Sequence, residues 1–144
     1  MWITADLDAE GLKQLQAAPD KIKRAAHNIA EYVLMATRRA APKKSGDLRR
    51  GIVLSPFVER TSLPGKAVFN VGFDEKMNDV FVKYSKSGTR YYYPASQEYG
   101  FHVNTRVNTR YVPGKYFMYA ASRTSDDVAV AEVEKLVDGI INQP

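Results

Sequence analysis

The sequence holds few of the side chains that carry out covalent or acid–base chemistry. It has no cysteine and only two histidines, so disulfides, Cys-based zinc sites and thiol nucleophiles are excluded. His27 lies beside the apolar stripe of a predicted helix and His102 adjoins a basic segment, which favours packing or contact roles over catalysis. No HExxH, GxSxG, P-loop or GxGxxG spacing occurs. We therefore expect no enzymatic activity, no metal and no cofactor.

Cations are the chemically distinctive groups instead. The chain has 21 Lys and Arg against 16 Asp and Glu, a formal net charge of +5. Residues 1–50 and residues 51–115 each carry +4, whereas residues 116–144 carry −3. Such an asymmetry fits contact with nucleic acid, head-to-tail packing of a basic face on the acidic face of another subunit, or a solvated surface.

The basic residues fall into two clusters. The first comprises Arg38, Arg39, Lys43, Lys44, Arg49 and Arg50, and the second comprises Lys83, Lys86, Arg90, Arg106, Arg110 and Lys115, with seven tyrosines among them. Cations interleaved with aromatic rings can bind phosphates and stack bases, but the same side chains can pack on a sheet or at an interface. Since no known DNA- or RNA-binding motif is present, we expect at most non-specific contact with nucleic acid.

The length of the chain predicts that a single domain positions these basic residues. A chain of 144 residues has the usual size of a single domain, and at ~150 residues roughly 68–70% of the unfolded surface is buried on folding. No apolar stretch approaches the ~18 residues of a membrane span, and the acidic start of the chain lacks the order of a signal peptide. We expect one domain over residues 1–144, with no membrane span, assembled in the cytoplasm.

Helical spacing is predicted towards both ends of the chain. Residues 1–19 could form an N-terminal arm, with helical spacing from Asp8. A long helix with Asp20 as its N-cap is predicted over about 21–41, because apolar residues recur there at steps of three and four. The last segment is also predicted to be helical and to divide at Ser125, which would cap its second part.

Short strands and one short helix are predicted between these helices. Turn signals separate strands over 48–57, 66–73 and 80–84. A short helix is expected from Pro94 to Gly100, and residues 101–113, with a tandem Val-Asn-Thr-Arg tetrad, are expected to form a β-ribbon or an extended basic loop. The predicted fold class is α+β: a long N-terminal helix, an antiparallel sheet of three to five strands, and a short helix and a C-terminal helix packed on the sheet.

Four segments, in this order, resemble the signature of small tail-completion or head–tail joining proteins of tailed bacteriophages and prophages. Ala40–Ile52 is similar to A-P-x-x-T/S-G-x-L-x-x-S-I, and Val68–Phe73 is similar to a strand V-x-V-G. Residues 93–100 (YPASQEYG) resemble Y-A-x-x-V-E-x-G, and residues 112–120 (VPGKYFMYA) resemble P-x-P-F-L-x-x-A. Together the resemblance covers about residues 20–141, most of the chain.

The resemblance implies a structural virion protein of the tail or neck, assembled in the host cytoplasm. Members of this family are thought to complete or terminate the tail, stopping tube growth and presenting a surface to the head–tail connector. The resemblance further implies a homo-oligomeric ring around the DNA channel, a hexamer by analogy with tail symmetry, with tail-tube and connector proteins as partners. The alternative is a non-specific nucleic-acid-binding or toxin–antitoxin-type cytoplasmic module.

The signature describes a shape rather than a catalytic site. Pro42 ends the long helix, Gly46 allows the chain to reverse, and Leu48 and Ile52 fill the sheet. In the later segments Gly100 ends the short helix and Phe117 begins the last one. Three features depart from the family pattern: Gly51 stands in place of the usual Ser, Gln97 stands at a commonly apolar position, and the 101–111 insertion is longer and more basic.

A closed ring requires a heterologous interface, in which one face meets a different face. The charge split predicts that the basic turn at 38–50 meets the acidic helix at 126–138; the candidate residues are Arg38, Arg39, Lys43, Lys44, Arg49, Arg50, Asp126, Asp127 and Glu134. Glu98 could cap a helix, pair with the basic turn or reach a neighbouring subunit. Arg90, Arg106 and Arg110 are candidates for contact with DNA in the channel or for docking on an adjoining ring.

Overall fold

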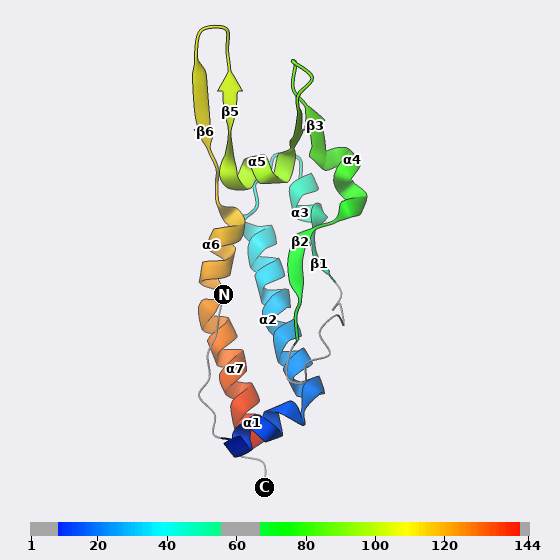
Figure 1. The fold of residues 1–144 in the computed structure, drawn as a ribbon, viewed down its shortest axis with the longest axis vertical. Helices are drawn as coiled ribbons and strands as arrows, with labels where there is room; N and C mark the ends of the chain where they lie inside the picture. The colour runs from blue at the N-terminus through cyan, green and yellow to red at the C-terminus, as the bar shows by residue number, and fades with distance from the viewer. Residues whose placement is uncertain (1–8, 56–66, 142–144) are drawn as a thin grey trace.

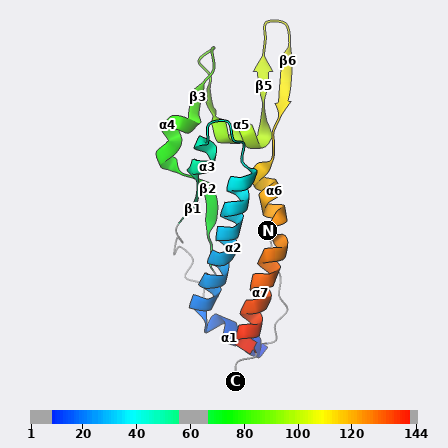
Figure 2. The same cartoon turned by 180° about the vertical axis from the view of Figure 1, so that it is seen from behind.

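Two long helical segments form the body of the molecule. The computed structural model describes residues 9–55 and 67–141. Helix α2 (Pro19–Ala40) runs antiparallel to α6 (Phe117–Thr124) and α7 (Asp126–Ile141), which follow one another along it (Figures 1 and 2). Helix α1 (Ala9–Gln16) lies at the far end of this body and packs against both α2 and α7.

Small side chains let these helices approach closely. Helix α2 buries Ala25, Ala30 and Thr37, and the α6–α7 segment that packs on it buries Ala121 and Ala129. The Thr37 hydroxyl donates to the carbonyl one turn back at 2.7 Å, so this buried polar group has a hydrogen-bond partner. Small residues therefore occupy buried positions on both halves of the helical body.

The long helix predicted over 21–41 corresponds to α2, which is the second helix of the described residues rather than their first element. Helix α1 precedes it, so most of the described part of the expected arm is helical; residues 1–8 lie outside the described residues. Helix α2 begins at Pro19 and has Asp20 in its first turn, not at the N-cap. Proline is well accommodated there because the first helical N–H has no intrahelical partner anyway.

The predicted division of the last helical segment at Ser125 is confirmed, and Ser125 stands directly before α7, where its carbonyl accepts the N–H of Ala129 at 3.0 Å. The Ser125 side chain is fully buried, and its hydroxyl donates to the carbonyl of Ala121 at 2.7 Å. It therefore satisfies a carbonyl at the end of α6, where the last turn of any helix leaves acceptors without intrahelical partners.

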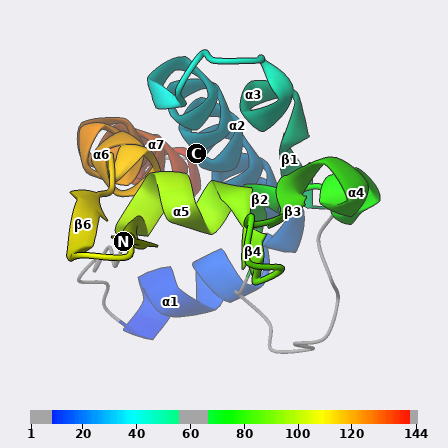
Figure 3. The ribbon, with the colours of Figure 1, turned by 90° about the horizontal axis from the view of Figure 1, so that it is seen from above.

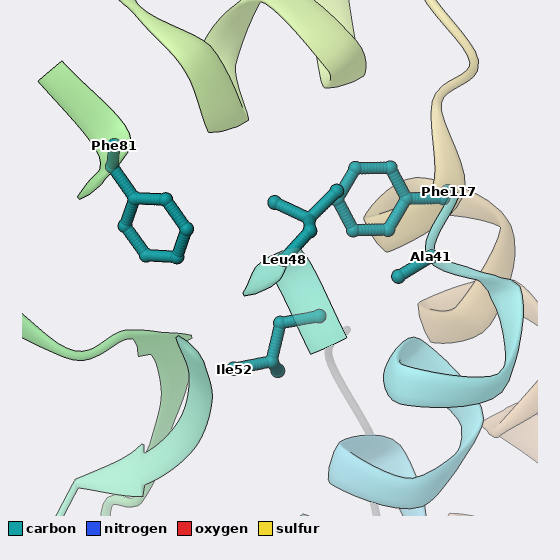
Figure 4. Close-up of a cluster of buried hydrophobic side chains, with 5 residues drawn as sticks. All are labelled: Ala41, Leu48, Ile52, Phe81 and Phe117. Carbon is teal, nitrogen blue, oxygen red and sulfur yellow. The ribbon is translucent and has the colours of Figure 1, made fainter. Parts of the chain in front are cut away.

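A buried apolar cluster joins the helical body to the segments that follow α2. Its five members are Ala41, Leu48, Ile52, Phe81 and Phe117 (Figure 4). The short helix α3 (Asp47–Gly51) begins after Gly46, whose φ of 78° confirms the predicted chain reversal. Leu48 and Ile52 are four residues apart and both face the cluster. These signature residues thus build the core beside the turn.

Gly51, one of the departures from the family pattern, is explained by this packing. A Cβ at position 51 would collide with the ring of Phe81, which is fully buried, and would lie 3.1 Å from the sulfur of Met77. The usual Ser therefore has no room here, because Phe81 occupies the space that its side chain would need.

The strands are shorter than predicted, and in the segments 48–57 and 80–84 this is because the first residues are helical. The strand expected over 48–57 begins as α3 and continues as β1 (Ile52–Ser55); residues 56 and 57 lie outside the described residues. Of the expected 66–73 strand, β2 (Asn70–Phe73) is formed. The 80–84 run starts in α4 (Asn78–Phe81), after the 3-10 turn η1 (Glu75–Met77), and ends as β3 (Val82–Tyr84).

The α+β class is shown, but the predicted single sheet of three to five strands is wrong. Within the described residues the strands form three separate antiparallel pairs: β1 with β2, β3 with β4 (Arg90–Tyr92), and β5 (Gly100–Asn104) with β6 (Thr109–Pro113). Helix α4 follows β2 and helix α5 (Tyr93–Tyr99) follows β4, so each pair is separated from the next by a helix. The helices accordingly pack mainly on one another, with the β1–β2 pair against α2.

Two hairpins extend from the same end of the molecule. Hairpins β3–β4 and β5–β6 point away from the helical body, and α5 lies across that end between their bases (Figures 1 and 3). The short helix predicted from Pro94 to Gly100 is confirmed as α5, and the 101–113 segment is the predicted β-ribbon. The opposite end carries α1 and the last turns of α7.

Candidate interaction surface

A buried carboxylate organises the base of the β5–β6 hairpin. Glu98, the last buried residue of α5, is 4% exposed. Its carboxylate accepts the backbone N–H of Met118 at 2.9 Å and that of Tyr119 at 3.1 Å. These donors belong to the first turn of α6, where a negative charge also interacts favourably with the helix dipole. Of the three roles foreseen for Glu98, helix capping is therefore the observed one, and its carboxylate is buried within its own chain.

Two glycines allow the chain to cross itself at this point. Gly100 has a φ of 88°, and a Cβ there would collide with the carbonyl of Val112. A Cβ on Gly114 would collide with the backbone of Glu98. The backbone N–H groups of residues 115 and 116 donate to the carbonyls of residues 97 and 98 at 2.8 and 3.1 Å. Two signature segments, 93–100 and 112–120, therefore meet in one close backbone crossing.

Tyrosines surround this crossing. The Tyr111 hydroxyl donates to the carbonyl of Tyr99 at 2.6 Å. Next to it Tyr116 adopts a left-handed φ of 48°, a conformation that is uncommon outside glycine. The proximity of Tyr111, through charge and a side-chain hydrogen bond, raises the pKa of Tyr116 above its usual 10.0, and burial and the Glu98 carboxylate add to the effect. The phenol therefore stays neutral well beyond physiological pH.

The basic turn between α2 and α3 uses two of its arginines internally. Arg38 donates from Nε to the carbonyl of Ile52 at 2.9 Å. Arg49 donates to the carbonyls of Ala41 and Arg39 at 3.3 and 3.0 Å. These half-buried guanidinium groups satisfy carbonyls at the end of α2 and the start of β1. Within their own chain these two arginines therefore hold the turn in place, and their contact with a second subunit stays a prediction.

The remaining cations of the turn are exposed. Arg50 forms an ion pair with Asp47 one turn earlier in α3, while Arg39, Lys43 and Lys44 present their side chains to solvent. Pro42 follows the end of α2 as predicted. Three of the six basic candidates, Arg38, Arg49 and Arg50, therefore have partners in their own chain, and four of the six, Arg50 included, are exposed.

The acidic face of α7 is a stripe that the sequence analysis identified in part. Asp127, Glu134 and Asp138 are exposed and recur at helical steps on one side of the helix, whereas Asp126 is half-buried. Asp138 was not among the predicted candidates, although its spacing of four from Glu134 would have indicated it. Glu132 lies off this stripe; it pairs with Lys135 at 3.5 Å and accepts from Asn28 at 3.4 Å.

The β5–β6 hairpin is the most exposed part of the described chain that carries regular structure. Every residue from 101 to 111 is exposed, and Val107 at its tip is 94% exposed. Arg106 and Arg110 lie on it, and Arg90 lies on the neighbouring hairpin opposite the exposed Tyr84. The three predicted docking cations are thus carried by two neighbouring hairpins at one end of the molecule.

The two histidines make ring contacts. The His27 ring meets the edge of Phe69 at 5.4 Å between centroids and lies 3.8 Å from the Glu31 carboxylate. The His102 ring lies 5.1 Å from that of Tyr111, directly across the hairpin. Over residues 9–55 and 67–141 no group of three or more His, Cys, Asp or Glu side chains is placed to hold a metal ion. Among the same residues no helix combines the length and apolarity that crossing a membrane requires.

Comparison with protein-family models, with curated proteins and with solved structures finds no match to the chain.

Proposed function

We propose that the chain is a structural subunit of a phage or prophage virion that acts in tail completion or termination and in head–tail joining. The observation that best supports this proposal is the backbone crossing at Glu98, Gly100 and Gly114, where two of the four signature segments interlock. The resemblance thus falls on residues that set a shape and hold a hairpin at a fixed position. A protein that joins other proteins depends on such a fixed surface.

The proposed assembly is a homo-oligomeric ring around the DNA channel in the tail or neck, a hexamer by analogy with tail symmetry. Its partners would be tail-tube and head–tail connector proteins, and its role would be structural rather than catalytic. A ring formed head to tail needs two different faces on each subunit. The molecule offers exposed cations at the hairpin end and exposed carboxylates along α7, and opposite charges favour encounter and orientation.

Deletion of the gene from a phage or prophage that carries it tests this proposal. We expect filled heads and separate tails that do not join, or tails of abnormal length, with infectivity restored by the gene in trans. Electron microscopy of the particles and of the purified protein, examined for rings, provides the measurement. Normal joined virions after deletion would contradict the proposal.

Non-specific nucleic-acid binding is the second candidate function, and one observation favours it. Residues 82–92 and 100–113, which form the two hairpins, contain five Lys and Arg residues and no Asp or Glu. If these cations contact phosphates, retention of duplex DNA should weaken steeply with salt because counterions are released on binding. Replacing Arg106 and Arg110 with Ala should then reduce both the retention and its salt dependence; retention that does not change would remove this candidate.

A further inference from the structure

The β5–β6 hairpin has two unlike faces. The register pairs Phe101 with Val112 and Val103 with Arg110, and residues directly opposite one another lie on the same face. We call Phe101, Val103, Arg110 and Val112 the apolar hairpin face. On the other face His102 lies opposite Tyr111, and their rings are in contact. Asn104 lies opposite Thr109, whose hydroxyl donates to the Asn104 side-chain oxygen at 3.1 Å.

Three of the four residues of the apolar hairpin face are exposed and Val112 is half-buried, although the composition of this face favours burial. Phe101 is 41% exposed and Val103 is 38% exposed. A two-stranded hairpin without a covered apolar face is marginally stable in water. Its base, however, is held in place by the backbone crossing at Glu98, Gly100 and Gly114, so the hairpin is a preorganised arm, which lowers the entropic cost of binding a partner.

Helix α7 carries a matching surface. The acidic stripe consists of Asp127, Glu134 and Asp138, and the exposed Val130 and Ala131 lie between its carboxylates. The stripe spans 11 residue steps of helix, roughly 16 Å, and one paired strand of the hairpin spans roughly 13 Å. The apolar hairpin face thus combines apolar side chains with a cation, and the acidic stripe combines apolar side chains with carboxylates. The two surfaces also have similar lengths.

The two surfaces of one chain cannot meet each other. The hairpin points away from the helical body at one end, and the acidic stripe runs along α7 towards the opposite end (Figures 1 and 2). A contact between them must therefore join two copies head to tail, which is the heterologous geometry that closes a ring or extends a filament.

We propose that the apolar hairpin face of one copy docks on the acidic stripe of α7 of the next, with Arg110 and Arg106 meeting the carboxylates of the stripe. The proposal rests on the assembly role proposed above and names its interface. It also replaces the 38–50 turn as the basic side of that interface, since Arg38 and Arg49 are engaged in their own chain.

Cross-linking between single-cysteine variants tests the contact, because the natural chain has no cysteine. V107C places a thiol at the hairpin tip and A131C places one within the acidic stripe. With a short bifunctional maleimide we expect a heterodimer band when the two variants are mixed, and much weaker bands from either variant alone. Absence of the mixed product at millimolar protein overturns the proposal, as does a V107C homodimer as the dominant product.

Charge reversal then identifies the groups responsible. R106E with R110E in the V107C chain should reduce cross-linking about tenfold or more, because like charges then oppose each other. The complementary reversal, D127K with E134K, is placed in the A131C chain. Mixing this chain with the V107C chain that carries R106E and R110E should restore the cross-linking. The matched control, K43E with K44E, should leave cross-linking unchanged; a loss in this control with full cross-linking by the hairpin variant overturns the proposal in favour of the turn.

The same variants separate the interface from the function. If reversal at 106 and 110 removes DNA retention but leaves cross-linking and rings intact, the hairpin binds nucleic acid and the interface proposal is overturned, while the virion role is untouched. If the gene proves dispensable for joining heads to tails, the virion role fails whatever the cross-linking shows.

Discussion

The α2–α3 turn and the β5–β6 hairpin are both basic, but they use their arginines differently. In the turn, Arg38 and Arg49 are half-buried and donate to backbone carbonyls between 2.9 and 3.3 Å away. On the hairpin, Arg106 and Arg110 are exposed on an arm with no acidic residue in its sequence. The turn therefore uses charge to hold a backbone reversal, and the hairpin presents charge outward. Positive charge in the sequence did not distinguish these roles, because backbone acceptors decide between them.

The largest effect is expected at the anchor of the hairpin. Glu98→Ala leaves two N–H donors of α6 without the carboxylate and should lower the free energy of unfolding by about 2–3 kcal/mol. Glu98→Gln, which keeps one acceptor oxygen, should cost about half as much. Chemical denaturation measures both; equal stability of the Ala variant and the parent would show that the crossing does not depend on this cap.

A second substitution tests the packing beside the turn. Gly51→Ser, which introduces the residue found at this position in the signature that the chain resembles, should destabilise the protein by about 1–3 kcal/mol because it overpacks the site against Phe81. Adding Phe81→Leu should cost less in the Gly51→Ser variant than in the parent, since both changes act on one contact. Thermal unfolding of the parent, the two single variants and the double variant gives this coupling energy, and strict additivity would contradict the proposed collision.

Alanine substitutions in the turn and on the hairpin compare the two basic regions directly, beginning with Arg49→Ala in the turn. Because it removes hydrogen bonds to two backbone carbonyls, we expect a loss of about 1–2 kcal/mol in stability. Arg110→Ala on the hairpin and Lys43→Ala in the turn should each stay within about 0.5 kcal/mol of the parent. Denaturation curves measured side by side provide the test; a similar loss for Arg49 and Arg110 would remove the distinction between the regions.

The smallest effect concerns the tyrosines of the hairpin base. The pKa of Tyr116 is raised chiefly by Tyr111, so the folded state favours the neutral phenol more than the unfolded state does. Its contribution to stability is complete below pH 10.0 and is lost as the pH rises through the raised folded value. Ultraviolet titration of tyrosinate should show Tyr111→Phe lowering the pKa of Tyr116 towards 10.0; no change would contradict the assigned cause.

Local sequence patterns predicted α2, α5 and the start of α7, but not the short helices α3 and α4. Steps of three and four located α2, the proline and glycine around 94–100 located α5, and the acidic pair after Ser125 located the start of α7. Strand predictions were weaker at 48–57 and 80–84, where each segment begins with helical residues. A short apolar run does not reveal whether its first residues close a helical turn before they extend.

The sequence by itself determined the α+β composition, the long helix with apolar residues at steps of three and four, the reversal at Gly46 and the division of charge between the body and the last helix. The tertiary structure alone decided that the strands form separate pairs, that Glu98 caps a helix 20 residues further on, and that Arg38 and Arg49 act within their own chain. The physical reason for this division is how far apart in the sequence the interacting residues are. Helical periodicity and turn geometry depend on near neighbours, whereas burial and the choice of hydrogen-bond partner depend on which distant segments the fold brings together.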